Sequence, residues 1–285
     1  MPLYTLHPPP PMDNPVLVFG LAGWGDAASA ASDAADWLAE DGQPIVTFDP
    51  DAVFDYRSNR PILRFAAGES QSLTWPRMEI VHVRPSGRDV LLLVGNEPDY
   101  AWSALCDAIS DLAQHFDIAH LVTLGAVPTP VKHGADTSVF CTTSDPRLLL
   151  GGDEMLMDEI VVPASAGTVF RSAVEEGGFE TIGYWAQVPQ YVGRPYHPAV
   201  TALLGRVAGQ LGTDFDLSGL QELSDVQVDR LDDIISQRSD AAEFVDNLEG
   251  RIGTTAKMPD TMPTADEIAD EVLKFLENPD AEENL

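Results

Sequence analysis

Apolar runs alternate with helical patterns along the first three quarters of the chain. The run Val16 to Phe19 predicts a buried strand, and the alanine-rich stretch from Ala27 to about Glu40 predicts the helix that follows it. Asp26 is placed to cap that helix, and Gly42 to end it before the next strand. Further strands are predicted at residues 45–48, 62–65, 80–83, 89–95, 120–125 and 181–188, and further helices at residues 100–116, 165–176 and 198–211. This alternation predicts an α/β domain of three layers, αβα, with a central parallel strand at residues 89–95.

The pattern changes after Leu217, where strands are no longer predicted. Ser224 and Gln227 have the spacing of a capping box that opens a helix. Apolar residues then recur at helical spacing, namely Leu231, Ile234, Ile235, Phe244, Val245 and Leu248. A second capping box, Thr264 with Glu267, opens a last amphipathic helix. We therefore divide the chain into an α/β core domain (1–212), a helical appendage (213–252), and a linker with a C-terminal amphipathic helix (253–285).

The chain is strongly acidic, and this limits its partners. Its 285 residues include 46 Asp and Glu against 16 Lys and Arg, a formal net charge of -30, and half of that charge lies in residues 213–285. Such a charge repels a nucleic acid or an anionic membrane, and no run of basic residues offsets it. No apolar run approaches the roughly 20 residues that span a bilayer, and the N-terminal residues do not resemble a secretion signal. We expect a cytoplasmic protein with no nucleic-acid or membrane partner.

Gly20, Gly23 and Gly25 precede the first predicted helix in the order G-x-x-G-x-G. This spacing differs from that of the dinucleotide-binding loop and of the phosphate-binding P-loop. Asp26 also places a negative charge where a bound phosphate would lie. The three glycines therefore predict a tight turn between strand and helix.

Five unusual residues each follow a predicted strand, namely Trp24, Asp26, Glu97, His133 and Tyr191. Because ligand crevices of open α/β sheets form at the carboxyl ends of the strands, these residues are predicted to line one crevice. Glu97 and His133 are candidates for acid/base chemistry, although Glu97 also fits a helix cap and His133 a structural role. Trp24 is either a core residue, like the other tryptophans, or a stacking surface for a ligand.

Other catalytic and cofactor motifs are not found in the sequence. No serine lies in a G-x-S-x-G elbow, and neither H-E-x-x-H nor a carboxylate cluster at metal spacing occurs. Cys106 and Cys141 lack ligand spacing and are predicted to be core residues. We expect neither a cofactor nor a metal.

Several segments together resemble one protein family. They are FGLAGWGDAASAASDAADWL (Phe19 to Leu38), DYRSNRP (Asp55 to Pro61), LTWP (Leu73 to Pro76), LLLVGNEPDYAWSAL (Leu91 to Leu105), LVTLGAVP (Leu121 to Pro128), GYWAQVPQYVGRPYHPAVTALL (Gly183 to Leu204) and FVDNLEG (Phe244 to Gly250). In this order they resemble the proteasome assembly chaperone 2 family in its actinobacterial form, over roughly residues 16–251. The resemblance implies a phosphorylase/hydrolase-like α/β fold, homo-oligomerisation and a role in protein assembly, but no reaction.

The chain departs from that family at two places. Family members that assemble proteasomes dock through a C-terminal hydrophobic-Tyr-x tail, whereas this sequence has Asn284 at the tyrosine position. The family often has His-Thr-Arg-Pro where this sequence continues from His133 with Gly134, Ala135 and Asp136. The resemblance therefore carries over neither proteasome docking nor an anion-binding arginine.

Three functions remain open at this point. The first is a non-catalytic homo-oligomeric scaffold or assembly chaperone with a protein partner, for which analogy with phosphorylase-like folds favours a trimer. The second is a hydrolase or transferase that uses the predicted crevice. The third is a small-ligand binder that uses the same crevice without chemistry. The sequence favours the first.

Overall fold

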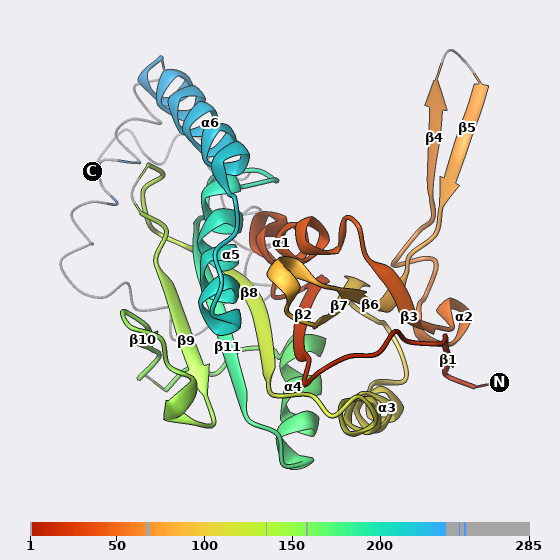
Figure 1. Cartoon of the computed structure of the whole chain (residues 1–285). Helices are drawn as coiled ribbons and strands as arrows, with labels where there is room; N and C mark the ends of the chain where they lie inside the picture. The colour runs from red at the N-terminus through yellow and green to blue at the C-terminus, as the bar shows by residue number, and fades with distance from the viewer. Residues whose placement is uncertain are drawn as a thin grey trace.

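The computed structural model describes residues 2–66, 69–134, 136–157 and 159–237, together with positions 245 and 248 (Figure 1). Its helices are α1 (Ala30–Ala39), α2 (Pro50–Val53), α3 (Trp102–His115), α4 (Ala166–Glu176), α5 (His197–Leu211) and α6 (Ser218–Ser236). Its strands are β1 (Tyr4–Leu6), β2 (Val16–Ala22), β3 (Gln43–Phe48), β4 (Ile62–Ala66), β5 (Glu69–Thr74), β6 (Met78–Val83), β7 (Val90–Asn96), β8 (Leu121–Thr129), β9 (Val139–Thr143), β10 (Glu154–Met155) and β11 (Thr181–Pro189). The predicted linker and last helix, and Phe244, lie outside the described residues.

Within the described residues, nine strands form one sheet in the order β1-β3-β6-β7-β2-β8-β11-β9-β10. The four inner strands β7, β2, β8 and β11 run parallel, which confirms the central parallel strand predicted at residues 89–95. Antiparallel strands flank this block, with β6, β3 and β1 on one side and β9 on the other. The sheet is therefore mixed, with its parallel part buried at the centre.

Helices cover both faces of the sheet, which gives the three predicted layers. Successive residues of β2 alternate between two apolar clusters: Val16 and Val18 face α1 and α5, whereas Leu17 and Phe19 face α3 and α4. All four of these β2 side chains are buried. Burial on both faces explains why the inner strands are continuous apolar runs and do not alternate with polar residues.

Helix α6 packs against α5, and its N-terminal start differs from the prediction. The helix begins at Ser218, so Ser224 lies inside it and donates its hydroxyl to the Leu220 carbonyl. Gln227 accepts a hydrogen bond from the His197 backbone at the start of α5. The predicted capping box is therefore wrong, because both side chains bond to other backbone groups.

The strands β4 and β5 form a separate two-stranded sheet that projects away from the body of the molecule (Figure 1). In Figure 1 this hairpin lies on the opposite side of the molecule from α6. Only β4 of this pair was expected from the sequence.

We expect Gly20→Ala to push α1 away from the sheet and to lower the free energy of unfolding. A Cβ at Gly20 would lie 2.4 Å from the Ala35 Cβ and 2.7 Å from the Ala31 carbonyl oxygen. Overpacking of this kind costs about 1–3 kcal/mol of unfolding free energy, measurable by urea denaturation. Gly205→Ala on α5 is the control, since its Cβ meets open space and should stabilise the helix by about 0.5–1 kcal/mol. An unchanged urea midpoint for Gly20→Ala would contradict this packing.

Candidate functional site

The loops that carry the predicted site residues follow the four parallel strands. Gly23 to Asp26 follow β2, Glu97 follows β7, His133 lies beyond β8, and Tyr191 follows β11. Because these strands are parallel, their carboxyl ends lie at one edge of the sheet. The hydrogen bonds of the predicted residues show which of them are in contact at this edge.

Glu97 joins the turn after β2 to the start of α4. Its Oε2 accepts a hydrogen bond of 2.6 Å from the Trp24 backbone N–H, and its Oε1 accepts one from the Ala166 backbone N–H. The carboxylate thus lies at the N-terminus of α4, where the helix dipole favours a negative charge. Gly23 allows this approach, since a Cβ there would lie 2.1 Å from Oε2. Both carboxylate oxygens of Glu97 are therefore engaged by the backbone.

Trp24 lies at the surface and not in the core. Its side chain is among the exposed hydrophobic residues, at 55% exposure, and its Nε1 donates a 3.1 Å hydrogen bond to the Pro163 carbonyl. The indole therefore contacts the loop that leads into α4. The prediction of a core role is wrong for Trp24 and also for Trp75, which is half exposed.

Asp26 caps α1, as the sequence predicts, but it does not directly precede the helix. The short turn Ala27–Ser29 intervenes, and the carboxylate accepts hydrogen bonds from the backbone N–H groups of Ala31, at 2.7 Å, and Ser32, at 3.2 Å. The Ser32 hydroxyl donates a further bond to the same carboxylate. Burial raises the pKa of Asp26, and these hydrogen bonds oppose that rise.

A second carboxylate near this cap also has a raised pKa. Burial, together with the nearby charges of Asp26 and Asp36, raises the pKa of Asp33 to about 6. The Arg194 guanidinium acts in the opposite direction on both Asp26 and Asp33. Negative charge is therefore concentrated at the start of α1. Ionising Asp26 and Asp33 at neutral pH costs free energy in the folded protein.

His133 is held by contacts at both ring nitrogens. Its side chain is only 2% exposed, its Nδ1 lies 2.7 Å from the Tyr191 hydroxyl, and its Nε2 lies 3.1 Å from Oδ1 of Asp232 on α6. The His133 backbone N–H also donates to the Tyr191 hydroxyl. Burial raises the pKa of Tyr191. This group ties α6 to the loops after β8 and β11.

Among the described residues, the five predicted residues thus form two hydrogen-bonded groups. One contains Trp24 and Glu97, with Asp26 two residues further along the same turn, and the other contains His133 and Tyr191. No described hydrogen bond joins Glu97 to His133. Their convergence on a single crevice stays a prediction.

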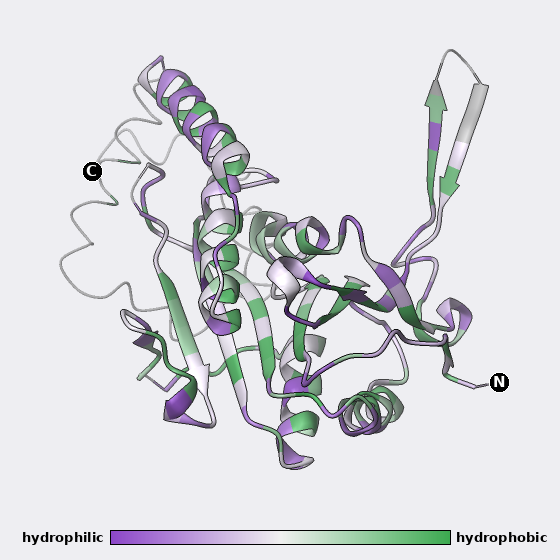
Figure 2. Cartoon of the chain, in the orientation of Figure 1, coloured by the Kyte–Doolittle hydropathy of each residue, from purple (hydrophilic) through white to green (hydrophobic). Residues whose placement is uncertain are grey.

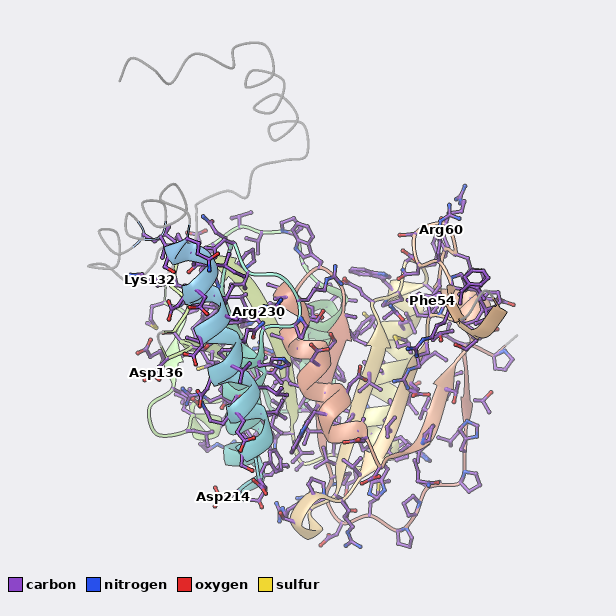
Figure 3. The ribbon with its side chains drawn as sticks, turned by 90° about the horizontal axis from the view of Figure 1, so that it is seen from above. Phe54, Arg60, Lys132, Asp136, Asp214 and Arg230 are labelled. Atoms are coloured by element: carbon purple, nitrogen blue, oxygen red, sulfur yellow. The ribbon has the colours of Figure 1, made fainter. Side chains whose placement is uncertain are left out.

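The surface is hollowed at other positions. A hollow of about 470 Å³ is lined by Thr137, Val139, Leu150, Gly151, Ala202, Gly205, Arg206 and Gly209. A smaller one of about 130 Å³ lies beside the loop after β8 and is lined in part by Lys132, Asp136 and Tyr196. Figure 3 places Lys132 and Asp136 at the same end of the molecule as Arg230 of α6. Neither hollow includes any of the five predicted residues among its lining residues.

Two kinds of feature are absent from the part of the chain that the structure describes. No three His, Cys, Asp or Glu side chains there are grouped so that they could hold a metal ion. None of the helices described is both long and apolar enough to cross a bilayer.

The partners of these side chains were not identified from the sequence. Ala166 lies 69 residues from Glu97, and Asp232 lies 99 residues from His133. No local pattern marks either contact, because both depend on how the sheet and its helices pack.

We expect Glu97→Ala to loosen the turn after β2 from α4. The change leaves the Ala166 backbone N–H, in a part-buried contact, without its acceptor, which costs about 1–3 kcal/mol, whereas water can replace the carboxylate at the exposed Trp24 N–H. Urea denaturation should show the loss, and Trp24 fluorescence should shift. Glu176→Ala, which removes an exposed carboxylate at the end of α4, is the matched control. Equal, small losses in both variants would contradict the role of Glu97.

We expect Asp33→Asn to stabilise the protein at pH 7 but not at pH 4. A raised folded-state pKa means that the folded protein binds the proton more tightly than the unfolded chain, so stability falls as pH rises from about 4 to about 6. After allowance for solvent screening the gain at pH 7 is about 1 kcal/mol. Thermal unfolding across this pH range measures it, with Asp111→Asn on the exposed side of α3 as the charge control. The same gain at pH 4 and pH 7 would contradict this cause.

Solved structures of other proteins share this fold. A protein of unknown function from Corynebacterium glutamicum has a TM-score of 0.81 and 27% identity, over 87% of this chain and 96% of that chain. A proteasome-assembly chaperone homologue from Mycobacterium tuberculosis has a TM-score of 0.72 and 32% identity, over 81% and 99%. A PAC2 family protein from Streptomyces avermitilis has a TM-score of 0.69 and 29% identity, over 81% and 99%. A search of curated proteins gives no match.

The family assignment agrees with these structures. The PAC2 family profile matches residues 20–235, which is most of the chain. The resemblance drawn from the sequence is confirmed, and the chain belongs to the PAC2 family.

Proposed function

We propose that this protein is a non-catalytic, homo-oligomeric scaffold of the cytoplasm that acts as an assembly chaperone. It binds a subunit of a larger protein complex and releases it when that subunit is incorporated. A trimer is the form favoured by analogy with phosphorylase-like folds.

The observation that carries the proposal is the structural use of the acid/base candidates. Glu97 accepts backbone hydrogen bonds with both carboxylate oxygens, and His133 is buried between Tyr191 and Asp232. A general acid or base needs a position within hydrogen-bond reach of a substrate. These partners instead stabilise the turn before α1, the start of α4 and the position of α6.

Exposed apolar side chains give independent support for protein binding. Trp24, Met157 and Val161 are exposed around the loop before α4, and the β4–β5 hairpin carries a further group. Exposed apolar patches on soluble proteins mark interaction sites. An assembly chaperone needs such surfaces, both for its own subunits and for the protein that it assists.

The identity of the assisted complex is left open by this proposal. The M. tuberculosis relative is described as a proteasome-assembly chaperone homologue. We therefore assign the partner by class, as a subunit of a multi-subunit assembly, and include in the proposal that residues 253–285 take part in its capture.

Light scattering and native purification test this function together. At micromolar concentration we expect a mass that is a multiple of the 30.8 kDa chain, with three chains favoured. Affinity purification of the full chain from native cytoplasm, followed by mass spectrometry, should recover subunits of one complex in an incompletely assembled state. A single-chain mass would contradict the scaffold.

A shortened chain serves as the control for partner capture. Ending the chain at Gly253 should keep the oligomer and reduce the recovery of the partner. Equal recovery by the full and shortened chains would contradict the role assigned to residues 253–285. Recovery of no complex by either chain would contradict the chaperone function itself.

A further inference from the structure

A mostly buried arginine lies on the face of the sheet that α4 covers. Helix α4 packs against this face and carries hydrophilic as well as hydrophobic residues (Figure 2). One of them is Arg171, whose side chain is only 13% exposed. Its guanidinium lies over Gly183 of β11, because a Cβ at that glycine would be 2.7 Å from Nη1. Burial lowers the pKa of Arg171, since the charged guanidinium has been taken out of water.

Two threonines lie beside the same glycine. In the sheet register Gly183 is directly opposite Thr123 of β8 on one side and Thr142 of β9 on the other. Their hydroxyl oxygens would lie 2.8 Å and 3.2 Å from a Cβ at Gly183. The two hydroxyls and Arg171 Nη1 therefore converge on one point of the sheet face.

Several donors of this group have no acceptor. A guanidinium has five N–H donors. The Nε of Arg171 donates to the Thr181 hydroxyl at 2.9 Å and its Nη1 to the Thr142 hydroxyl, and the described residues accept no other hydrogen bond from it. Thr123 is 6% exposed, and its hydroxyl forms no hydrogen bond with any described residue. Because buried donors are normally paired, these donors point to an acceptor that is not part of the described chain.

The positive charge of Arg171 is also incompletely balanced. Within the described part of the chain its ion pair is with Glu175, whose Oε2 lies 4.0 Å from Nε. That oxygen also accepts the Thr181 hydroxyl at 3.0 Å, and the Glu175 side chain is 42% exposed. A buried charge is stable when it is both paired and hydrogen-bonded. An anion beside Nη1 and Nη2 would supply the missing acceptors and the missing negative charge together.

We propose that Arg171, Thr123 and Thr142 form a binding site for a small oxyanion, which is a phosphate or a carboxylate group. Oxygens of the anion accept the remaining N–H groups of Nη1 and Nη2, in the paired arrangement that guanidinium groups favour. The Thr123 hydroxyl donates to the anion, and so does that of Thr142, whose oxygen already accepts from Nη1. Gly183 is the third residue of β11, so this site lies away from the carboxyl ends of the strands. It adds small-ligand binding to the proposed scaffold function.

Calorimetric titration of the full chain with inorganic phosphate tests this site. We expect saturable binding, which sodium chloride of equal ionic strength does not reproduce. A parallel titration with acetate tells a carboxylate site from a phosphate site. Arg171→Met should raise the dissociation constant at least tenfold, with circular dichroism to verify the fold. Arg147→Met, which removes an arginine side chain that is 76% exposed, is the control and should bind as the unchanged protein does.

Thr123→Val separates anion binding from folding. Its hydroxyl forms no hydrogen bond with the described residues, so the unfolding midpoint should stay unchanged or rise. The dissociation constant for the anion should rise about fivefold, because one hydrogen bond to it is lost. Thr201→Val on α5 is the matched control, since its buried hydroxyl also lacks a partner among the described residues but lies outside this group. Anion binding should be normal in that variant.

Two results would overturn the inference. One is a heat of mixing without saturation for both phosphate and acetate, and the other is unchanged affinity in either Arg171→Met or Thr123→Val. A lower unfolding midpoint for Arg171→Met without anion binding by the unchanged protein would leave Arg171 as a link between α4 and the sheet. The scaffold function would stand in each of these cases, because it does not depend on the anion.

Discussion

Burial of the parallel strands on both faces is the constraint on which this structure depends. Strands β7 and β2 lie between two helical layers, so the side chains on both of their faces are apolar. Polar side chains occur only where these strands end. At the carboxyl edge the chain must still satisfy the backbone N–H groups that begin α1 and α4. Asp26 and Glu97 do so, each with its carboxylate. In the sequence Asp26 and Glu97 look like candidates for a functional site. In the structure their presence is explained by the backbone N–H groups that they satisfy at the start of α1 and α4.

Long elements could be predicted from the sequence because their signals are local. The runs that became β2, β7, β8 and β11 are apolar over their whole length, and α3, α4 and α5 were expected within a few residues of their observed ends. The strands β1, β9 and β10 were missed because they are short and pair with partners elsewhere in the chain, and β5 was missed because its residues are mostly polar. The error at Ser224 has a similar cause, because a spacing that fits a helix start also occurs inside a longer helix.

The candidate site was predictable in outline and not in its contacts. Strand order along the chain was sufficient to place Trp24 and Glu97 at one edge of the sheet. A capping role for Glu97 was also foreseen, but for α3, whereas the structure places its carboxylate at α4. The difference arises because α4 is positioned by packing against α3 and the sheet, far from Glu97 in the sequence. Contacts of that kind have no signature within a few residues of either partner.

The charge of this protein constrains how it can associate with itself. Two copies that each carry a formal charge of -30 repel at long range, so any attraction between them must act at short range. Physiological salt screens exposed charges beyond about 8 Å, which removes most of that repulsion and leaves contacts at the interface. Exposed apolar side chains such as those of Trp24 and Phe65 offer contacts of this short range, because burying them against another surface leaves the net charge unchanged. The acidity of the chain therefore restricts any association between copies to surfaces where apolar side chains come into direct contact.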